Sequence, residues 1–268
     1  MATTALHTAA TGMNAISTQI DVIANNLANV NTVGFKGSRV NFEDLLYQTQ
    51  AQPGTENANG DQRPAGVQVG LGVRVANTDF NFNQGSPIDT GQPLDLYIEG
   101  NGFFSVDILD NQGATIGYTR AGNFFINSEG DMVLGNSSGP KLIPNINIPS
   151  DAITIDISED GIVSVIQPGS ATPTQVGQIT LTSFINHKGL KAVGANIFIE
   201  TNSSGPPIEA NPGENGMGIF KQGFLEGSNV DPVKELVELI KAQRAFELNS
   251  QSIQAADQSL QVVANLRR

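Results

Sequence analysis

The sequence predicts an α+β protein in which the two ends of the chain form one helical domain around an inserted all-β domain. Three observations predict this class. An apolar heptad pattern runs along residues 4–30, and a second runs along residues 232–267. The residues between them show short apolar alternations of period two, separated by turns rich in glycine and asparagine. Because both ends carry the same pattern, we expect them to pair in space as a discontinuous, coiled-coil-like domain.

The N-terminal helix is predicted over residues 4–30, a length of roughly 40 Å. We expect it to end near residues 31–34, because asparagine and glycine accept the left-handed conformation that terminates helices. The whole terminal segment is assigned to residues 1–35. Its apolar residues recur in alternating steps of three and four, which is the spacing of a coiled-coil seam. The seam consists of Leu6, Ala9, Met13, Ile16, Ile20, Ile23, Leu27 and Val30.

A linker or extended arm is predicted next, over residues 36–66. Phe42, Leu45 and Leu46 give its first part an apolar stretch that could pack on the helices. Residues 50–65 are rich in proline, glycine, asparagine and glutamine, which is typical of turns and loops. The sequence leaves open whether this part is a flexible loop or an arm that contacts a neighbouring molecule.

The β-rich outer domain is predicted over residues 67–227. Residues 67–82 alternate apolar and polar side chains, as a half-buried strand does. Two strands are expected within residues 94–107, joined by a hairpin turn at Gly100-Asn101-Gly102. Many short strands at close spacing are typical of a β-sandwich or barrel-like domain. The other strands are expected at residues 115–119, 123–126, 132–134, 153–157, 162–167, 175–184 and 195–200.

The C-terminal helix is predicted over residues 232–267, within a terminal segment of residues 228–268. Asp231 can cap its first turn, and Pro232 takes the first helical position, where a missing N–H costs nothing. The seam of this helix has one polar member. It consists of Leu239, Ala242, Phe246, Asn249, Ile253, Ala256, Leu260 and Val263.

The two seams have two possible uses. Each helix could pack on its own domain as an ordinary amphipathic helix, or the seams could bind other subunits. Length favours the second use, since helices of roughly 40 and 54 Å exceed the typical three turns. Burying the large apolar residues of the first seam would contribute roughly 10–20 kcal/mol at most, and ordering about 27 residues costs at least as much. We therefore expect both ends to be largely disordered in a free monomer and to fold on assembly.

The charge of the chain is concentrated in its middle. The net charge is −12, of which residues 1–50 contribute −1, residues 228–268 contribute 0, and the middle contributes −11. Near-neutral ends suit self-association, whereas an acidic middle suits a solvated surface. A nucleic-acid partner is not expected, because no basic patch is available to meet phosphates. We also expect no membrane insertion and no cleaved signal peptide, since no long apolar run occurs and the first residues lack a basic start.

Catalytic and metal-binding residues are not predicted. The chain has no cysteine, and its two histidines, His7 and His187, are expected at the surface. No cofactor site and no zinc site are therefore expected. Two carboxylate pairs could in principle cleave glycosides, but both lie beside turn glycines, where acidic residues are common anyway. These pairs are Asp107 with Asp110, and Glu159 with Asp160.

Two terminal motifs give the chain a specific resemblance. The N-terminal motif is Asp21-Val-Ile-Ala-Asn-Asn-Leu-Ala-Asn-Val-Asn-Thr-Val-Gly-Phe-Lys36. The C-terminal motif combines Gln222-Gly-Phe-Leu-Glu-Gly-Ser-Asn-Val230 with Gln243-Arg-Ala-Phe-Glu-Leu-Asn249. With these motifs the chain resembles the flagellar basal-body rod and hook family of axial proteins. Gln52-Pro-Gly54 and the segment after it are most similar to the distal rod members of that family, and the resemblance covers essentially the whole chain.

The resemblance implies a structural subunit that polymerises helically into the rigid shaft joining the flagellar motor to the hook. It implies export through the flagellar type III route, without cleavage, to a basal body that crosses the periplasm. The implied partners are further copies of the chain, proximal rod proteins and hook protein at the two ends, the surrounding envelope rings, and the export apparatus. The paired helices would line a central channel, the β-domain would form the outer wall, and the linker would stiffen the shaft.

The resemblance also suggests interface residues. On the N-terminal helix these are Leu6, Met13, Ile16, Ile20, Ile23, Asn25, Asn26, Leu27, Asn29 and Val30. On the C-terminal helix they are Leu239, Gln243, Arg244, Phe246, Asn249, Ile253, Leu260 and Val263. We expect the three N-terminal asparagines to fix the register of the helices, with Gln243, Arg244 and Asn249 opposite them. Exposed polar residues near helix ends are the simpler alternative for both groups.

Two other functions remain open on the sequence. The chain could be another flagellar axial subunit, such as the hook protein or a different rod protein, with the same mechanism of assembly. More distantly, it could be a β-rich envelope protein that binds or cleaves glycans. Concentration-dependent polymerisation would distinguish an axial subunit from the glycan protein.

Overall fold

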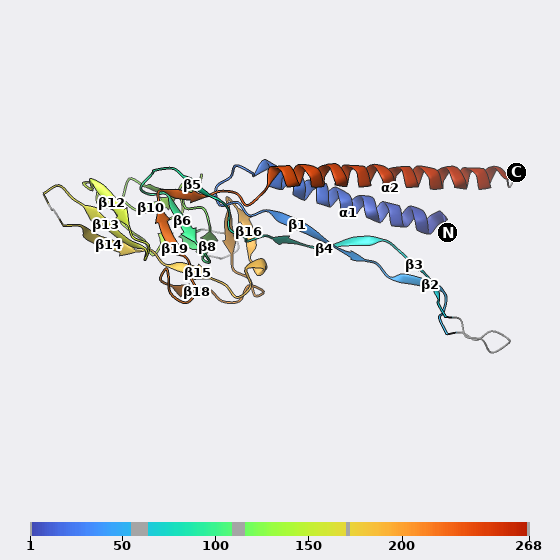
Figure 1. The fold of residues 1–268 in the computed structure, drawn as a ribbon, viewed down its shortest axis with the longest axis horizontal. Helices are drawn as coiled ribbons and strands as arrows, with labels where there is room; N and C mark the ends of the chain where they lie inside the picture. Colours follow the sequence, from blue (N-terminus) through green and yellow to red (C-terminus); the bar gives the residue numbers. More distant parts are fainter. Residues whose placement is uncertain (1, 55–63, 109–115, 170–171, 267–268) are drawn as a thin grey trace. The chain divides into compact units, whose positions relative to one another are not determined.

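The computed structural model describes residues 2–54, 64–108, 116–169 and 172–266, and its chain divides into two compact units. The terminal unit combines residues 1–28, 38–80 and 231–268, and the central unit combines residues 29–37 and 81–230. Two terminal helices with many strands between them confirm the predicted α+β class (Figure 1). The two ends of the chain lie in one unit, as the paired heptads predict.

The terminal unit is built on two antiparallel helices, α1 (Ala2–Ala28) and α2 (Pro232–Leu266), which lie side by side in Figure 1. Two pairs of residues give their register. The Asn26 side chain lies 3.4 Å from the carboxylate of Glu235, and a Cβ on Gly12 would lie 3.4 Å from Asn249. Moving 14 residues back along α1 thus moves 14 residues forward along α2.

The start of α2 is fixed locally, as predicted. Asp231 Oδ1 accepts hydrogen bonds from the backbone N–H groups of Val233, at 3.0 Å, and Lys234, at 3.3 Å. Pro232 is the first helical residue. An aspartate in this position satisfies backbone donors that have no partner within the helix.

A long two-stranded ribbon completes the terminal unit, where the sequence predicts a linker. Strand β1 (Ser38–Asp44) pairs with β4 (Val73–Phe80), and β2 (Tyr47–Ala51) pairs with β3 (Val67–Gly70), both antiparallel. The predicted strand at residues 67–82 is therefore two strands, divided near Gly72, whose φ of +125° is accessible mainly to glycine. Residues 55–63 of the predicted linker lie outside the described residues.

The ribbon moves the domain boundaries away from those predicted. Residues 67–80 belong to the terminal unit, because they pair with residues 38–51. Residues 29–35 and 228–230, which the sequence assigns to the helical ends, belong to the central unit. The physical reason is that backbone pairing between distant segments, rather than the local side-chain pattern, decides which unit a strand joins.

The central unit is a set of short antiparallel sheets. The largest has the strand order β11-β7-β8-β17-β16, and a second has the order β12-β13-β14. Four further pairs each form a two-stranded sheet: β9 with β10, β5 with β20, β6 with β19, and β15 with β18. A short 3₁₀ turn, η1, spans His187–Gly189. The strands are β5 (Pro87–Asp89), β6 (Leu96–Glu99), β7 (Phe104–Asp107), β8 (Ile116–Thr119), β9 (Phe124–Ile126), β10 (Met132–Leu134), β11 (Leu142–Ile143), β12 (Thr154–Ile157), β13 (Ile162–Ile166), β14 (Thr174–Gln178), β15 (Leu181–Ser183), β16 (Lys191–Gly194), β17 (Ile197–Ile199), β18 (Ile208–Ala210), β19 (Ile219–Gln222) and β20 (Phe224–Glu226).

One predicted turn is wrong in kind. Gly100-Asn101-Gly102 does join two strands, but they do not form a hairpin, since β6 pairs with β19 while β7 pairs with β8 and β11. Gly100 instead lets this segment pass close to the backbone of a distant segment. A Cβ on Gly100 would lie 2.9 Å from the backbone of Gly218, so the residue permits a close backbone approach.

The hydrophobic core of the molecule lies in the central unit. Phe104 occupies its middle, with the ring of Phe220 stacked on it at 5.5 Å and the edge of Phe124 at 5.0 Å. Leucine, isoleucine and methionine side chains from at least six strands surround these rings. The terminal unit is different, because its buried apolar residues among those described are Ala9, Ala15, Ile23 and Ala242.

Candidate functional site

The seam of α1 is only partly covered by the rest of the terminal unit. Ala9 and Ile23 are buried, whereas the other seam residues within the helix keep part of their surface exposed. Val30 lies beyond the end of α1, in a turn. The half-buried members within α1 are Leu6, Met13, Ile16, Ile20 and Leu27.

The seam of α2 follows the same rule. Ala242 is buried, and Phe246 keeps 39% of its surface exposed. The side chain of Val263 lies outside the described residues. The members that are half-buried are Leu239, Asn249, Ile253, Ala256 and Leu260.

The three predicted register asparagines have three different environments. Asn26 is 3% exposed and pairs with the backbone of Ser38 in both directions, donating at 2.8 Å and accepting at 2.9 Å. Asn29 accepts a hydrogen bond from the Thr32 hydroxyl at 3.1 Å. Asn25 is exposed on α1. Asn26 thus joins α1 to the start of β1, a role that the sequence pattern alone did not specify.

The predicted polar partners on α2 do not lie opposite these asparagines. Asn26 faces Glu235 near the start of α2, whereas Asn249 lies beside Gly12. Gln243 and Arg244 are exposed. The Arg244 guanidinium donates to Glu247 at 2.8 Å on its own helix. The antiparallel direction of the helices explains the difference, because it brings the end of α1 to the beginning of α2.

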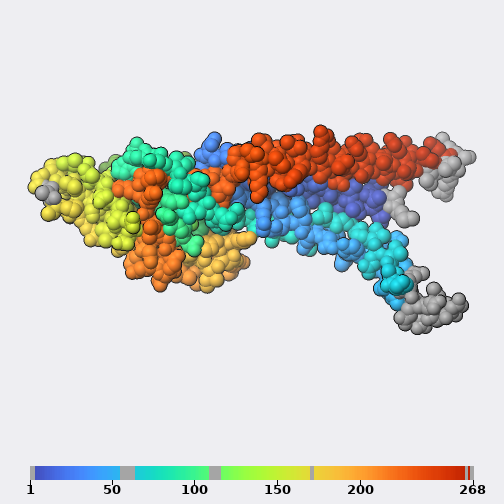
Figure 2. Space-filling view, in the orientation of Figure 1, coloured from blue at the N-terminus to red at the C-terminus, as the bar shows by residue number. Residues whose placement is uncertain are grey.

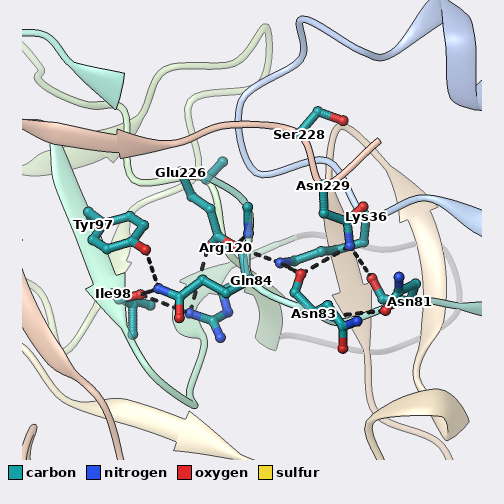
Figure 3. A network of polar contacts seen from close by, with 12 residues as sticks. Lys36, Asn81, Asn83, Gln84, Tyr97, Ile98, Arg120, Glu226, Ser228 and Asn229 are labelled. Atoms are coloured by element: carbon teal, nitrogen blue, oxygen red, sulfur yellow. Dashed lines mark hydrogen bonds and ion pairs between the residues drawn. The ribbon is translucent and has the colours of Figure 1, made fainter. Parts of the chain in front are cut away.

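A second candidate site is a buried ionic network in the central unit, which Figure 3 shows from close by. The Lys36 ammonium lies 2.6 Å from Glu226 Oε1, and the Arg120 guanidinium lies 3.6 Å from Glu226 Oε2. The three side chains are 0%, 1% and 5% exposed. Two buried cations therefore share one buried carboxylate.

Backbone groups extend this network. Lys36 also donates to the carbonyl of Asn83 at 2.8 Å, and Glu226 Oε1 accepts from the N–H of Gly85 at 2.9 Å. Arg120 donates to the carbonyls of Gly100, at 2.6 Å, and Ile98, at 3.3 Å. These bonds replace much of the hydration that buried charges lose.

The electrostatics of the network follow from burial. Burial lowers the pKa of Lys36, and Glu226 partly opposes this by favouring the charged ammonium. Burial also lowers the pKa of Arg120, and the Glu226 carboxylate partly opposes this by favouring the charged guanidinium. Removing the carboxylate would therefore leave two cations in a low-dielectric interior with no opposite charge.

The network holds together the two places where the chain enters and leaves the central unit. Gly34 N donates to the backbone carbonyl of Glu226 at 2.7 Å. Asn229 accepts from Gly37 N at 2.8 Å and donates to the carbonyls of Asn81, at 2.6 Å, and Asn83, at 3.0 Å. Both terminal motifs thus contribute to one buried structure, which fastens segments almost 200 positions apart.

Sequence reasoning missed the role of this network. Lys36 and Glu226 lie 190 positions apart, so no local pattern links them. The sequence does carry one signal of burial, because each of the two charged residues lies between glycines and apolar residues. A charged residue in such a segment is either exposed or paired in the interior.

Only part of the two predicted carboxylate pairs lies within the described residues. No group of three or more histidine, aspartate or glutamate side chains that could hold a metal ion is found there. Glu159 and Asp160 are exposed in a turn, and Asp110 lies outside the described residues. No helix in the described part of the chain is both long and apolar enough to span a membrane.

The two histidines differ. His7 is exposed on α1, as predicted. His187 is half-buried, with ring contacts to Phe103 at 5.7 Å and Phe82 at 6.1 Å, so its predicted surface position is wrong. Burial, and secondarily the charge of Arg120, lower the pKa of His187. The expected turn is present, but Phe82 and Phe103, which cover the ring, come from segments distant in the sequence.

Comparison with protein families finds three matching segments. Residues 6–36 match the family described as flagella basal body rod protein, and residues 97–165 match the flagellar hook protein FlgE/F/G D1 domain. Residues 221–266 match the flagellar basal body rod FlgEFG protein C-terminal family. The first and last segments contain Lys36 and Glu226, the two ends of the buried network.

Comparison with individual proteins gives similarity over nearly the full chain. The chain is 47% identical to the flagellar basal-body rod protein FlgG of Borreliella burgdorferi, over 98% of each chain. It is 46% identical to FlgG of Caulobacter vibrioides, over 98% of this chain and 99% of the relative. It is 45% identical to FlgG of Buchnera aphidicola from Schizaphis graminum, over 96% of each chain.

Proposed function

The chain belongs to the flagellar basal-body rod protein family, and we propose that it is the structural subunit of the distal rod. In this role, copies of the chain polymerise into the rigid shaft that carries torque from the motor to the hook. The relatives at 45–47% identity and nearly equal length are named flagellar basal-body rod proteins, which supports a rod subunit over a hook subunit.

The observation that carries this proposal is the incomplete burial of the terminal unit. Its helices run for 27 and 35 residues, yet most of their seam side chains are only half-buried. A monomeric protein gains little from such long helices with so small a core. Additional copies would supply the missing cover, and the two seams would then form a coiled-coil-like inner core of the polymer.

The seam residues and the nearby polar residues named above would form the subunit interface in this arrangement. The helices would line the central channel, and the acidic central unit would form the outer wall. The ribbon β1–β4, with the arm beyond it, would contact neighbouring copies and stiffen the shaft. Proximal rod proteins and hook protein would meet the two ends of the polymer, and the envelope rings would surround it.

The chemistry of the molecule supports a structural role. The buried charges of the central unit are engaged with one another and with backbone groups, so they serve stability. Assembly from the far end of a narrow channel would require export of an unfolded chain through the flagellar type III route. Helices that gain most of their cover only in the polymer suit that route, because they resist unfolding little beforehand.

A pair of neighbouring substitutions tests the proposal. Ile23→Asp places a charge at a buried seam position, whereas Ala24→Asp places the same charge on the exposed side of α1. We expect Ile23→Asp to abolish polymerisation of concentrated protein in electron micrographs, and Ala24→Asp to leave it nearly unchanged. Circular dichroism of the strands should stay unchanged in both variants. Normal polymerisation of Ile23→Asp would overturn the proposed interface.

The cellular role needs its own experiment. Deletion of the gene should yield basal bodies that lack the distal part of the rod and carry no hook, as seen by electron cryotomography. Complete rods in such cells would contradict the assignment.

A further inference from the structure

The terminal unit has two apolar surfaces that its own residues leave open. We propose that the first surface of one copy binds the second surface of the next copy. The first, the outer α2 face, consists of Val233, Leu236, Val237 and Ile240, which are 69%, 46%, 46% and 58% exposed. Their spacing of three, four and seven residues puts them on one side of the helix. Figure 2 shows α2 uncovered along its outer flank.

The second surface, the α1–ribbon groove, is a hollow of about 490 Å³ between α1 and the ribbon. Most of its lining is apolar, and none of its lining residues is charged. Gly12 and Gly72 let the elements around the groove pack closely, since a Cβ on Gly12 would lie 3.4 Å from Asn249 and one on Gly72 would clash with Thr11. Six of the residues that line it are Gly12, Ala15, Ile16, Phe42, Gly72 and Val73.

The two surfaces match in character. A ridge of four aliphatic side chains spans two helical turns, or about 10 Å. The lining of the groove is mostly apolar and carries no charged side chain, which suits an aliphatic ridge. A charged ligand would find no opposite charge in the groove, so an aliphatic helix face is the better occupant.

The two surfaces lie on opposite sides of α2, so the same contact can be made from one copy to the next. Asn249 borders the groove, and Ile240 belongs to the outer α2 face. Nine residues separate them, which corresponds to a rotation of about 180° net around the helix. A copy that accepts a neighbour in its groove therefore presents its own outer α2 face on the opposite side. Such a contact joins two different surfaces and does not saturate with a dimer.

The occupant we assign is a second copy of this chain, and the inference rests on the proposed function. Residues 1–50 and 228–268, which supply most of both surfaces, have net charges of −1 and 0, so copies do not repel one another there. The surfaces also belong to one unit, so each copy carries both. The proposed self-association thus has two defined contact surfaces, the outer α2 face and the α1–ribbon groove.

Cysteine cross-linking tests the contact directly, because the chain contains no cysteine. Gln19→Cys labels the groove, Leu236→Cys labels the outer α2 face, and Lys234→Cys is the matched control. Lys234 is exposed within the same turn as Leu236 but points about 160° away from it. The variants are mixed in pairs, polymerised and oxidised briefly.

We expect the Gln19→Cys and Leu236→Cys mixture to give about tenfold more cross-linked dimer than the Gln19→Cys and Lys234→Cys mixture. Equal yields in the two mixtures would overturn the inference. So would a dominant Leu236→Cys self-dimer, which would mean that outer α2 faces meet each other.

A charge substitution gives a second readout. Ile240→Asp should slow polymerisation by about tenfold, since it puts a charge into an apolar contact. Ser259→Asp, exposed on the same helix, should leave the rate almost unchanged. The controls separate two kinds of failure. If the unmodified chain forms no polymer, the proposed function fails, but if it polymerises and Ile240→Asp has no effect, only this inference fails.

Discussion

The central unit and the terminal unit solve the same folding problem in different ways. The central unit buries phenylalanine, leucine and isoleucine side chains from many strands, together with the charged residues Lys36, Arg120, Asp131 and Glu226. Among its described residues, the terminal unit buries chiefly three alanines and one isoleucine, and leaves six aliphatic residues of α2 largely uncovered. The contrast teaches that the central unit is complete within one chain, whereas the terminal unit leaves apolar surface that we propose other copies cover.

Removal of the central aromatic ring should have the largest effect on stability. Phe104→Ala deletes a fully buried ring from the core, which costs about 3–5 kcal/mol. Phe42→Ala deletes a ring that is 42% exposed on the ribbon. Urea denaturation followed by circular dichroism should show a small change for Phe42→Ala, below about 1.5 kcal/mol. Equal losses would contradict the contrast between the units.

Loss of the shared carboxylate should come next. Glu226→Gln leaves the Lys36 and Arg120 cations without an opposite charge, which costs about 3–5 kcal/mol if both stay charged. Glu43→Gln is the control, because Glu43 pairs with Arg74 at an exposed site and its loss should cost at most about 1 kcal/mol. Urea midpoints of the two variants measure the difference. A stable Glu226→Gln protein would mean that the buried network does not hold the central unit together.

A smaller effect concerns the cap of α2. Asp231→Ala removes the acceptor for two backbone N–H groups, which should cost about 0.5–2 kcal/mol. The loss should fall on the terminal unit, so amide hydrogen exchange should accelerate along the first turns of α2. Asp231→Asn, which keeps a capping oxygen, should restore most of the protection. An increase in exchange confined to the central unit would argue against the division of the molecule.

The smallest predicted effect concerns acid stability. Hydrogen bonds from Asn147, Lys141 and Asn145 lower the pKa of Asp131 to about 2. A carboxylate whose folded pKa is depressed stabilises the fold above its unfolded pKa of 3.8, and that contribution is lost as the pH falls from about 4 to 2. Asp131→Asn should flatten the dependence of stability on pH in this window. Glu129→Gln, which changes the other carboxylate partner of Lys141, serves as the control. An unchanged slope in Asp131→Asn would contradict the assigned hydrogen bonds.

Local patterns explain which parts of the fold the sequence predicts well. The start of α2 depends on two adjacent residues, Asp231 and Pro232, so it was predicted to the residue. The strands β10 and β13 are short apolar runs bounded by turn residues, and they match the predictions at residues 132–134 and 162–167 to within one residue. Each of these features is decided by side chains within a few positions of one another.

Long-range pairing explains the failures. Strand β2 has the sequence Tyr-Gln-Thr-Gln-Ala, which lacks a buried face and forms because β3 lies beside it. The turn at Gly100-Asn101-Gly102 looks like a hairpin locally, but β6 finds its partner in β19, more than 100 positions away. The ion pair of Lys36 and Glu226 is hidden for the same reason. The predicted interface residues stay a prediction, and which residue of α2 each residue of α1 faces depends on the antiparallel register.

Hydrogen exchange of the intact chain, before and after polymerisation, tests the contrast between the units most directly. In dilute protein, amides of α1, α2 and the ribbon should exchange quickly, whereas amides of the central strands should be protected. After assembly, protection should rise along both helices and the ribbon, and should change little in the central unit. Full protection of the helices in the dilute monomer, with no gain on assembly, would contradict the account.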